Sequence, residues 1–159
     1  MSKRIGTELN KETIELMRNL DTIYVLGTVN EDGTPHTTPV GLLYALNSKT
    51  LTVFLYRVNV TAKNIVRKNN VCINFLAENN LAINIVGTAK KVKSFEQFDI
   101  FVINISGVDS RRTPFAKITG GIKIELQRDL FNPEYIKKYY ELIEGIGGSY
   151  HEPKESKLQ

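Results

Sequence analysis

The sequence has no tryptophan, one cysteine and two histidines among its 159 residues. The lone Cys72 excludes an intrachain disulfide, and His36 and His151 lie too far apart in the sequence to give a zinc-ligand spacing. No stretch approaches the roughly 20 apolar residues that a membrane-spanning helix needs, and the N-terminus lacks the apolar core of a signal peptide. We therefore expect a cytoplasmic protein with no membrane anchor and no structural metal.

Motifs of several large enzyme classes are also missing. The sequence contains neither a GxGxxG fingerprint nor a P-loop, which argues against Rossmann-type and Walker-type nucleotide binding. No nucleophile elbow frames a serine, so a hydrolase is not expected. The net charge of +4 and the pI of about 9.1 make the surface mildly basic. This charge suits an anionic ligand but lacks the dense clustering of lysine and arginine found in nucleic-acid-binding proteins.

The sequence does contain a series of short β-branched and aromatic runs separated by turns. Six of them predict strands, at residues 23–30, 35–44, 50–56, 71–77, 81–92 and 118–127. The connections are too short for repeated crossover helices, so the strands should pair antiparallel. Helices are predicted after Asn10, within 62–68 and from Pro133. The pattern predicts a mainly β fold with flanking helices, a six-stranded antiparallel barrel.

One domain is expected over residues 1–148, with a helix near each end, followed by a polar tail over 149–159. Segment 95–105 fits a strand or a helix, because its apolar residues have a mixed period. Residues 106–114 are predicted to form a loop that exposes Arg111 and Arg112. That loop is either simply solvated or holds an anionic substrate.

The junction between the run at 50–56 and the next helix has the features of an anion site. Arg57 ends the strand, Asn59 or Thr61 can cap the helix, and Lys63 falls in its first turn. The first turn of a helix carries roughly half a positive charge and unpaired N–H groups, so Arg57, Thr61 and Lys63 together would attract a phosphate. The alternative is that Thr61 only caps the helix while the two cations lie in water.

The run from Thr37 to Leu42 is unusual for a strand. Pro39 donates no ladder hydrogen bond and Gly41 has no side chain. A sheet edge, a bulge, or a flat ligand against the backbone would each explain this composition. A flat ligand here and a phosphate at the neighbouring junction would suit a phosphorylated planar cofactor, and Val40→Trp is then expected to exclude that cofactor while sparing the fold.

Three stretches in this order carry a family resemblance: LGTVNEDGTPHTTPVGL, TLTVFLYRVNVTAKNIVRKNNVCINF and INIVGTAKKV. They resemble the FMN-binding split-barrel superfamily, which includes pyridoxamine 5'-phosphate oxidase-like and flavin reductase-like proteins. The likeness covers roughly residues 13–92. It implies a split barrel, a homodimer with FMN at its interface, and a flavin-dependent oxidoreductase that acts on a small-molecule substrate or a redox partner.

The resemblance also implies which residues contact the cofactor. The strand residues would line the isoalloxazine with backbone groups, and the residues of the strand–helix junction would hold the ribityl phosphate. Asn64 matches the asparagine of a T-x-x-N pattern in flavin reductase-like members. The implied cofactor-binding residues are Thr37, Thr38, Pro39, Val40, Gly41, Leu42, Tyr56, Arg57, Thr61, Lys63 and Asn64.

The chain departs from true pyridoxamine phosphate oxidases at several positions. Those enzymes have an arginine where Ala62 stands and a glutamine where Ala82 stands. They also end with a tryptophan and arginine motif, which a chain without tryptophan cannot match. The resemblance therefore supports flavin binding more than it supports pyridoxal phosphate synthesis.

Three alternatives stay open. The deazaflavin F420 would suit the same groove, because its phosphate-bearing tail favours basic residues such as Lys63, Arg57, Arg111 and Arg112. A non-catalytic flavin binder, either an electron carrier or a ligand sensor, would need the same site. A small basic barrel that binds single-stranded nucleic acid would use Tyr24, Tyr44 and Tyr56 as stacking surfaces, although tyrosines in strands more often pack in the core.

Overall fold

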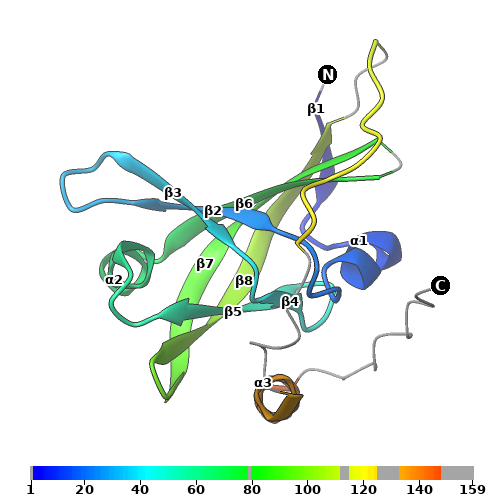
Figure 1. The fold of residues 1–159 in the computed structure, drawn as a ribbon. Coiled ribbons are helices and arrows are strands. Elements are labelled where there is room, and N and C mark those ends of the chain that lie inside the picture. Colours follow the sequence, from blue (N-terminus) through cyan, green and yellow to red (C-terminus); the bar gives the residue numbers. More distant parts are fainter. Residues whose placement is uncertain (1, 79, 112–114, 125–132, 148–159) are drawn as a thin grey trace. The chain divides into compact units, whose positions relative to one another are not determined.

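The computed structural model describes residues 2–78, 80–111, 115–124 and 133–147 (Figure 1). The chain divides into two compact units, residues Met1–Ile124 and Glu125–Gln159. In the second unit the described residues form α3 (Pro133–Gly145), which begins at the predicted proline. The predicted polar tail lies outside the described residues. No helix in the described ranges is long and apolar enough to cross a membrane.

The first unit contains an antiparallel sheet and two short helices. Its elements are β1 (Ser2–Gly6), α1 (Lys11–Leu16), β2 (Tyr24–Val29), β3 (Pro35–Val40), β4 (Leu43–Ala45), β5 (Thr50–Tyr56), α2 (Val60–Arg67), β6 (Asn70–Ala77), β7 (Leu81–Phe95) and β8 (Phe98–Arg111). The strands follow the order β3-β2-β6-β7-β8-β5-β4, and β1 pairs with β8.

The order of the strands explains how the sheet curls into a half-barrel. β3 and β4 lie at opposite ends of this order, yet only Gly41 and Leu42 separate them in the chain. The backbone therefore joins the two edges of the sheet directly, and the sheet must bend to let it do so. The predicted mainly β, antiparallel split barrel is confirmed, with eight strands in the described part of the chain where six were expected.

The core lies on the concave side of the sheet. Successive side chains of a strand point to opposite faces, and β6 shows this directly: Val71, Ile73 and Phe75 are buried while Cys72 and Asn74 are exposed. The helix α2 covers one end of the barrel and adds two side chains to the same hydrophobic cluster, Ala62 and Ile65. The outer face of the sheet is thus left to carry a site.

Local sequence patterns predicted most helices and strands near their observed positions. Asn10 caps α1 as predicted, with its side chain accepting a hydrogen bond from the Thr13 N–H at 2.8 Å. Of the two predicted caps for α2, Asn59 is the one used, and it accepts from the Thr61 N–H at 3.0 Å. The predicted strand over 35–44 divides at Gly41, because its first part pairs with β2 and its second part pairs with β5.

Two predictions about the chain after residue 105 were wrong. The predicted loop over 106–114 is, through Arg111, the end of strand β8, which also resolves the undecided segment 95–105 as strand. The described part of the predicted closing strand, residues 118–124, makes an isolated bridge between Lys123 and Thr22.

Candidate functional site

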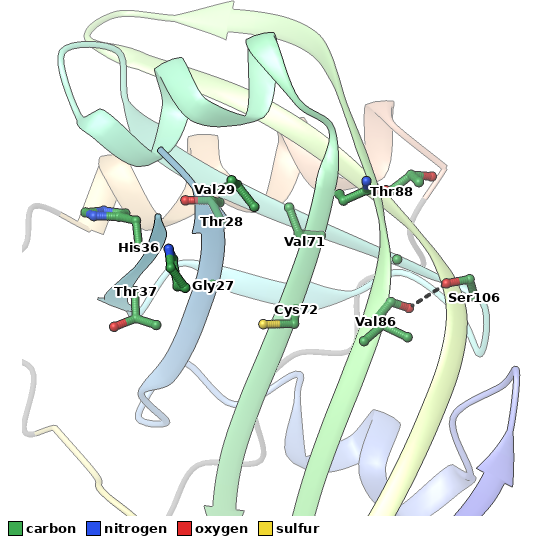
Figure 2. A pocket seen from close by; sticks show the side chains of 13 residues that line it. Gly27, Thr28, Val29, His36, Thr37, Val71, Cys72, Val86, Thr88 and Ser106 are labelled. Carbon is green, nitrogen blue, oxygen red and sulfur yellow. Dashed lines mark hydrogen bonds between the residues drawn. The ribbon is translucent and has the colours of Figure 1, made fainter. Parts of the chain in front are cut away.

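A pocket of about 460 Å³ opens on the outer face of the sheet (Figure 2). This volume falls within the roughly 300–1,000 Å³ typical of small-molecule sites. Its lining extends from β3 across β2, β6 and β7 to β8. The lining residues are Gly27, Thr28, Val29, Pro35, His36, Thr37, Asn70, Val71, Cys72, Val86, Gly87, Thr88 and Ser106.

Small side chains form the floor of this pocket. Register places Thr37 opposite Gly27, Gly27 opposite Cys72, and Cys72 opposite Val86, so these four residues form one row across four strands. A Cβ atom at Gly27 would lie 2.4 Å from the Cys72 sulfur, which means that the thiol side chain already covers the glycine. The row leaves a floor without long side chains, against which a flat ligand can lie.

Strand β3 forms one wall of the pocket and is an edge of the sheet. β2 is its neighbour in the strand order, so about half of its backbone N–H and C=O groups point away from any strand partner. Its side chains alternate: Thr37 and Pro39 are exposed, Thr38 is half-buried, and Val40 is 7% exposed within the core cluster. The backbone of β3 can therefore offer hydrogen bonds to a ligand in the way that the composition of this strand suggested.

The position of Val40 corrects one prediction. Because its side chain faces the core, Val40→Trp would overpack the barrel and would not simply block a ligand. Gly41 is different: a Cβ there would lie 3.4 Å from Ile23 Cδ1, which is tight but not prohibitive. Packing within the chain therefore does not by itself demand a glycine at this position.

Side-chain hydrogen bonds fasten α2 to the β2–β3 hairpin. The Asn64 amide donates to Thr28 Oγ1 at 3.2 Å and to Asn30 Oδ1 at 3.0 Å. Arg67 Nη2 donates to Asn64 Oδ1 at 3.1 Å and also to the carbonyl of Val29. Asn64 is 3% exposed, and both hydrogens of its amide are used inside the protein. Asn64 therefore fixes the position of α2 beside the pocket.

The N-terminal end of α2 makes a further contact with the hairpin. The hydroxyl of Thr61 lies 3.1 Å from Nε2 of His36, and Thr61 is fully buried. Lys63, one turn into the helix, is exposed. Sequence reasoning placed Thr61 at an anion site but assigned His36 no role there, although His36 lies in the same run as the predicted strand residues.

Arg57 forms hydrogen bonds with residues of the β7–β8 hairpin. Its Nε donates to Asp99 Oδ1 at 3.2 Å and its Nη2 donates to the Glu96 carbonyl at 3.0 Å. Lys91 and Ser94 also contact the Asp99 carboxylate, each at 2.8 Å. Burial raises the pKa of the Asp99 carboxyl, but the hydrogen bonds from Lys91, Ser94 and Arg57 lower it by more, so its pKa lies below the ordinary value.

The Asp99 cluster predicts a pH dependence of folding stability. A carboxyl with a depressed folded-state pKa stabilises the fold above its ordinary pKa of 3.8, and this contribution is lost as pH falls through the lower folded value. Urea unfolding midpoints should therefore fall less on acidification in Asp99→Asn than in the wild type. Glu78→Gln, which removes an exposed carboxylate paired with Lys123, is the control. Equal acid sensitivity of Asp99→Asn and the wild type would contradict this assignment.

The residues predicted at the cofactor thus fall into three groups. Thr37 lines the pocket, with the rest of 38–42 continuing along the same edge. Thr61 and Asn64 bind α2 to the hairpin, and Lys63 is exposed beside them. Tyr56 and Arg57 pack against the β7–β8 hairpin, where the Tyr56 ring lies 4.4 Å from that of Phe98. Arg111 ends β8, and Arg112 lies outside the described residues.

Comparison with known protein families gives one match. The sequence model of the family described as Pyridoxamine 5'-phosphate oxidase matches residues 11–117, which includes every strand of the sheet except β1. No curated protein sequence matches the chain. The family match therefore covers the whole pocket described above.

Solved structures share the fold at low sequence identity. A candidate pyridoxamine 5'-phosphate oxidase from Lactobacillus delbrueckii is 22% identical, with a TM-score of 0.57 over 67% of this chain and 98% of that one. An F420 reductase is 13% identical, with a TM-score of 0.50 over 62% and 98%. The haem storage protein HutZ from Vibrio cholerae is 14% identical, with a TM-score of 0.50 over 62% and 92%. At these identities the likeness shows the fold alone.

Proposed function

Because the chain belongs to the pyridoxamine 5'-phosphate oxidase family, we propose that it is a flavoprotein that binds FMN on the outer face of its barrel and uses it in an oxidation–reduction reaction. One observation supports this most directly. The pocket of about 460 Å³ is bordered by an edge strand with outward-facing backbone groups, and one of its lining residues, His36, contacts Thr61 in the first turn of α2. A flat ring with a phosphate-bearing chain needs both features at once.

The residues present suit such a ligand. In the proposal the ring lies along β3, and its phosphate lies near the first turn of α2. Two residues are assigned indirect roles. Asn64 holds α2 in place, and Arg57 contributes positive charge although its guanidinium is paired with the Asp99 carboxylate. The residues proposed to lie along the cofactor are Thr37, Thr38, Pro39, Val40, Gly41, Leu42, Tyr56 and Lys63, and Thr61 belongs to the helix turn at its phosphate end.

A homodimer is part of the same proposal. Apolar side chains are exposed on the outer face of the sheet around the pocket, with exposed fractions of 39% for Val25, 48% for Leu76 and 37% for Val86. Exposed apolar side chains on the face that carries the pocket suit an interface. A second copy packed here would cover the pocket and keep water from the bound ring.

FMN, when bound, supplies hydride or electron transfer at its isoalloxazine ring. The chain's residues then need only bind the ring, orient it and exclude water. We do not propose pyridoxal phosphate synthesis: Ala62, where those enzymes carry an arginine, is 2% exposed in the core, and Ala82 lies on β7 in place of a glutamine. The substrate is therefore a different small molecule or a redox partner.

F420 is the second candidate for the same site, favoured by the basic residues near α2 and by the fold shared with an F420 reductase. Titration of the purified protein with FMN and F420 separates the two. Oxidation of NADH or NADPH by the FMN-loaded protein, with an added electron acceptor, would distinguish an enzyme from a non-catalytic flavin binder. Failure of the protein to take up either cofactor would overturn the proposed function.

Lys63→Ala is expected to raise the FMN dissociation constant about tenfold or more, because a hydrogen bond to a charged group contributes roughly 1.5–3 kcal/mol. Lys68→Ala is the matched control, since Lys68 is an equally charged, exposed residue at the other end of α2. Fluorescence titration measures both variants. An equal change in the two would mean that only overall charge matters and that the phosphate does not contact Lys63. Adding Arg57→Ala to Lys63→Ala would make the result harder to interpret, because Arg57 is also a partner of Asp99.

A further inference from the structure

His36 lies where the pocket meets α2. It lines the pocket and is half-buried, and its Nε2 lies 3.1 Å from Thr61 Oγ1. Thr61 itself is fully buried. Figure 2 shows the side chains of His36 and Thr37 extending from β3 in different directions, as expected for successive residues of a strand. His36 therefore links the lining of the pocket to the first turn of α2, where the Thr61 hydroxyl is covered.

We propose that His36 donates a hydrogen bond to the phosphate of the cofactor, and that Thr61 positions His36 for this contact. The inference rests on the proposed function and names a residue for the phosphate end of the same site. Thr61 then acts through the imidazole and makes no direct contact with the phosphate, unlike the role expected from the sequence.

In this proposal Thr61 selects the tautomer of the His36 imidazole. A neutral imidazole has one N–H donor and one acceptor nitrogen, and a threonine hydroxyl can either donate to Nε2 or accept from it. In this proposal the Thr61 hydroxyl donates to Nε2, which leaves the ring proton at Nδ1. Nδ1 is then the donor that a phosphate oxygen needs. With the opposite tautomer, Nδ1 would present a lone pair to the anion and repel it.

The surroundings favour an anion at this point. Thr61 belongs to the first turn of α2, where the helix dipole contributes roughly half a positive charge. Lys63 is exposed in the same turn. The backbone of His36 is also fixed relative to α2, because His36 pairs with Thr28 on β2 and the Thr28 hydroxyl accepts a hydrogen bond from Asn64 of α2.

A comparison of FMN with riboflavin isolates the phosphate, because riboflavin has the same ring and ribityl chain without it. His36→Leu is expected to weaken FMN binding about tenfold to a hundredfold and to leave riboflavin binding nearly unchanged, so that the preference for FMN is lost. His36→Gln, which keeps an N–H donor, should retain part of the preference. Unchanged FMN preference in His36→Leu would overturn the proposal.

Thr61 is tested by a spectroscopic measurement that does not depend on any cofactor. The chain has two histidines, so His151→Gln leaves His36 as a single imidazole signal in nitrogen-15 NMR. At mildly alkaline pH the apo form of this variant should carry the His36 ring proton at Nδ1. Adding Thr61→Val should increase the population of the tautomer protonated at Nε2, and adding Thr61→Ser should leave the populations unchanged. A proton at Nε2 in the parent protein would overturn the positioning role of Thr61.

These outcomes separate the inference from the function on which it rests. If the wild-type protein binds neither FMN nor riboflavin, the proposed function fails, whereas the tautomer measurement still reports on the Thr61–His36 pair. If the wild type prefers FMN and His36→Leu keeps that preference, the function stands and the role of His36 is overturned. Riboflavin binding also serves as a check that each variant is folded.

Discussion

Thr37→Trp is expected to lower FMN affinity about tenfold to a hundredfold while leaving the barrel folded. Thr37 is exposed, lines the pocket and faces Gly27 across the β2–β3 ladder. An indole at this position would lie over the small side chains of the pocket floor, in the space proposed for the ring. Forcing bulk into an occupied space costs roughly 1–3 kcal/mol, which corresponds to this loss of affinity.

Two controls make the Thr37 result specific. Thr37→Ser keeps a small side chain and should bind FMN like the wild type. Lys93→Trp places the same indole at an exposed position of β7 that does not line the pocket, and it should also bind normally. A Thr37→Trp protein with unchanged FMN affinity would show that the ring lies elsewhere on the chain.

Gly87→Ala is expected to lower the free energy of unfolding by roughly 1–3 kcal/mol, as overpacking in a tight interior does. A Cβ atom at Gly87 would lie 2.4 Å from the carbonyl oxygen of Asn104 and 3.2 Å from Ile103 Cγ2. The register between β7 and β8 shifts at Val86 and Gly87, which marks a bulge. Because β8 is held by β5 on its other side, its backbone cannot move away.

Urea unfolding of Gly87→Ala beside Gly120→Ala tests this expectation. A Cβ at Gly120 would meet nothing within 4 Å, so the control variant carries the same change of residue without the clash. Replacing glycine with alanine also restricts the unfolded chain and stabilises by about 0.4–1 kcal/mol, which the clash at Gly87 should exceed. Equal unfolding midpoints in the two variants would contradict the steric argument.

The elements that the sequence predicted are those that local patterns control. The Asn10 cap of α1 and the alternating side chains of β6 depend on residues close together in the chain. Strand β1 was missed because its sequence is short and polar, and it exists through pairing with β8, where Ser2 lies opposite Arg111. Most of β8 fits either a strand or a helix from its sequence, because its apolar residues have a mixed period, and its end at 106–111 was predicted as a loop. The polar residues at that end are tolerated in a strand because neighbouring strands on both sides satisfy its backbone.

In the candidate site, too, the sequence predicted local features but not contacts between distant residues. The residue types at the strand–helix junction predicted an anion site, but sequence spacing could not reveal which partner each side chain takes. Arg57 pairs with Asp99, 42 residues away, and Thr61 pairs with His36, 25 residues away. Both partners come together only when the sheet has curled. That is why the sequence singled out Thr61 for the phosphate, while the fold draws attention to His36.

The most direct test of the flavin proposal is the visible absorption spectrum of the freshly purified protein, followed by mass spectrometry of the small molecule that heating releases. The proposal predicts the two visible bands of an oxidised flavin and a released mass equal to that of FMN. A single visible band, together with a released molecule of the larger mass of F420, would mean that F420 and not FMN occupies the site. A colourless protein that takes up neither molecule, or a haem spectrum without flavin, would contradict the proposal.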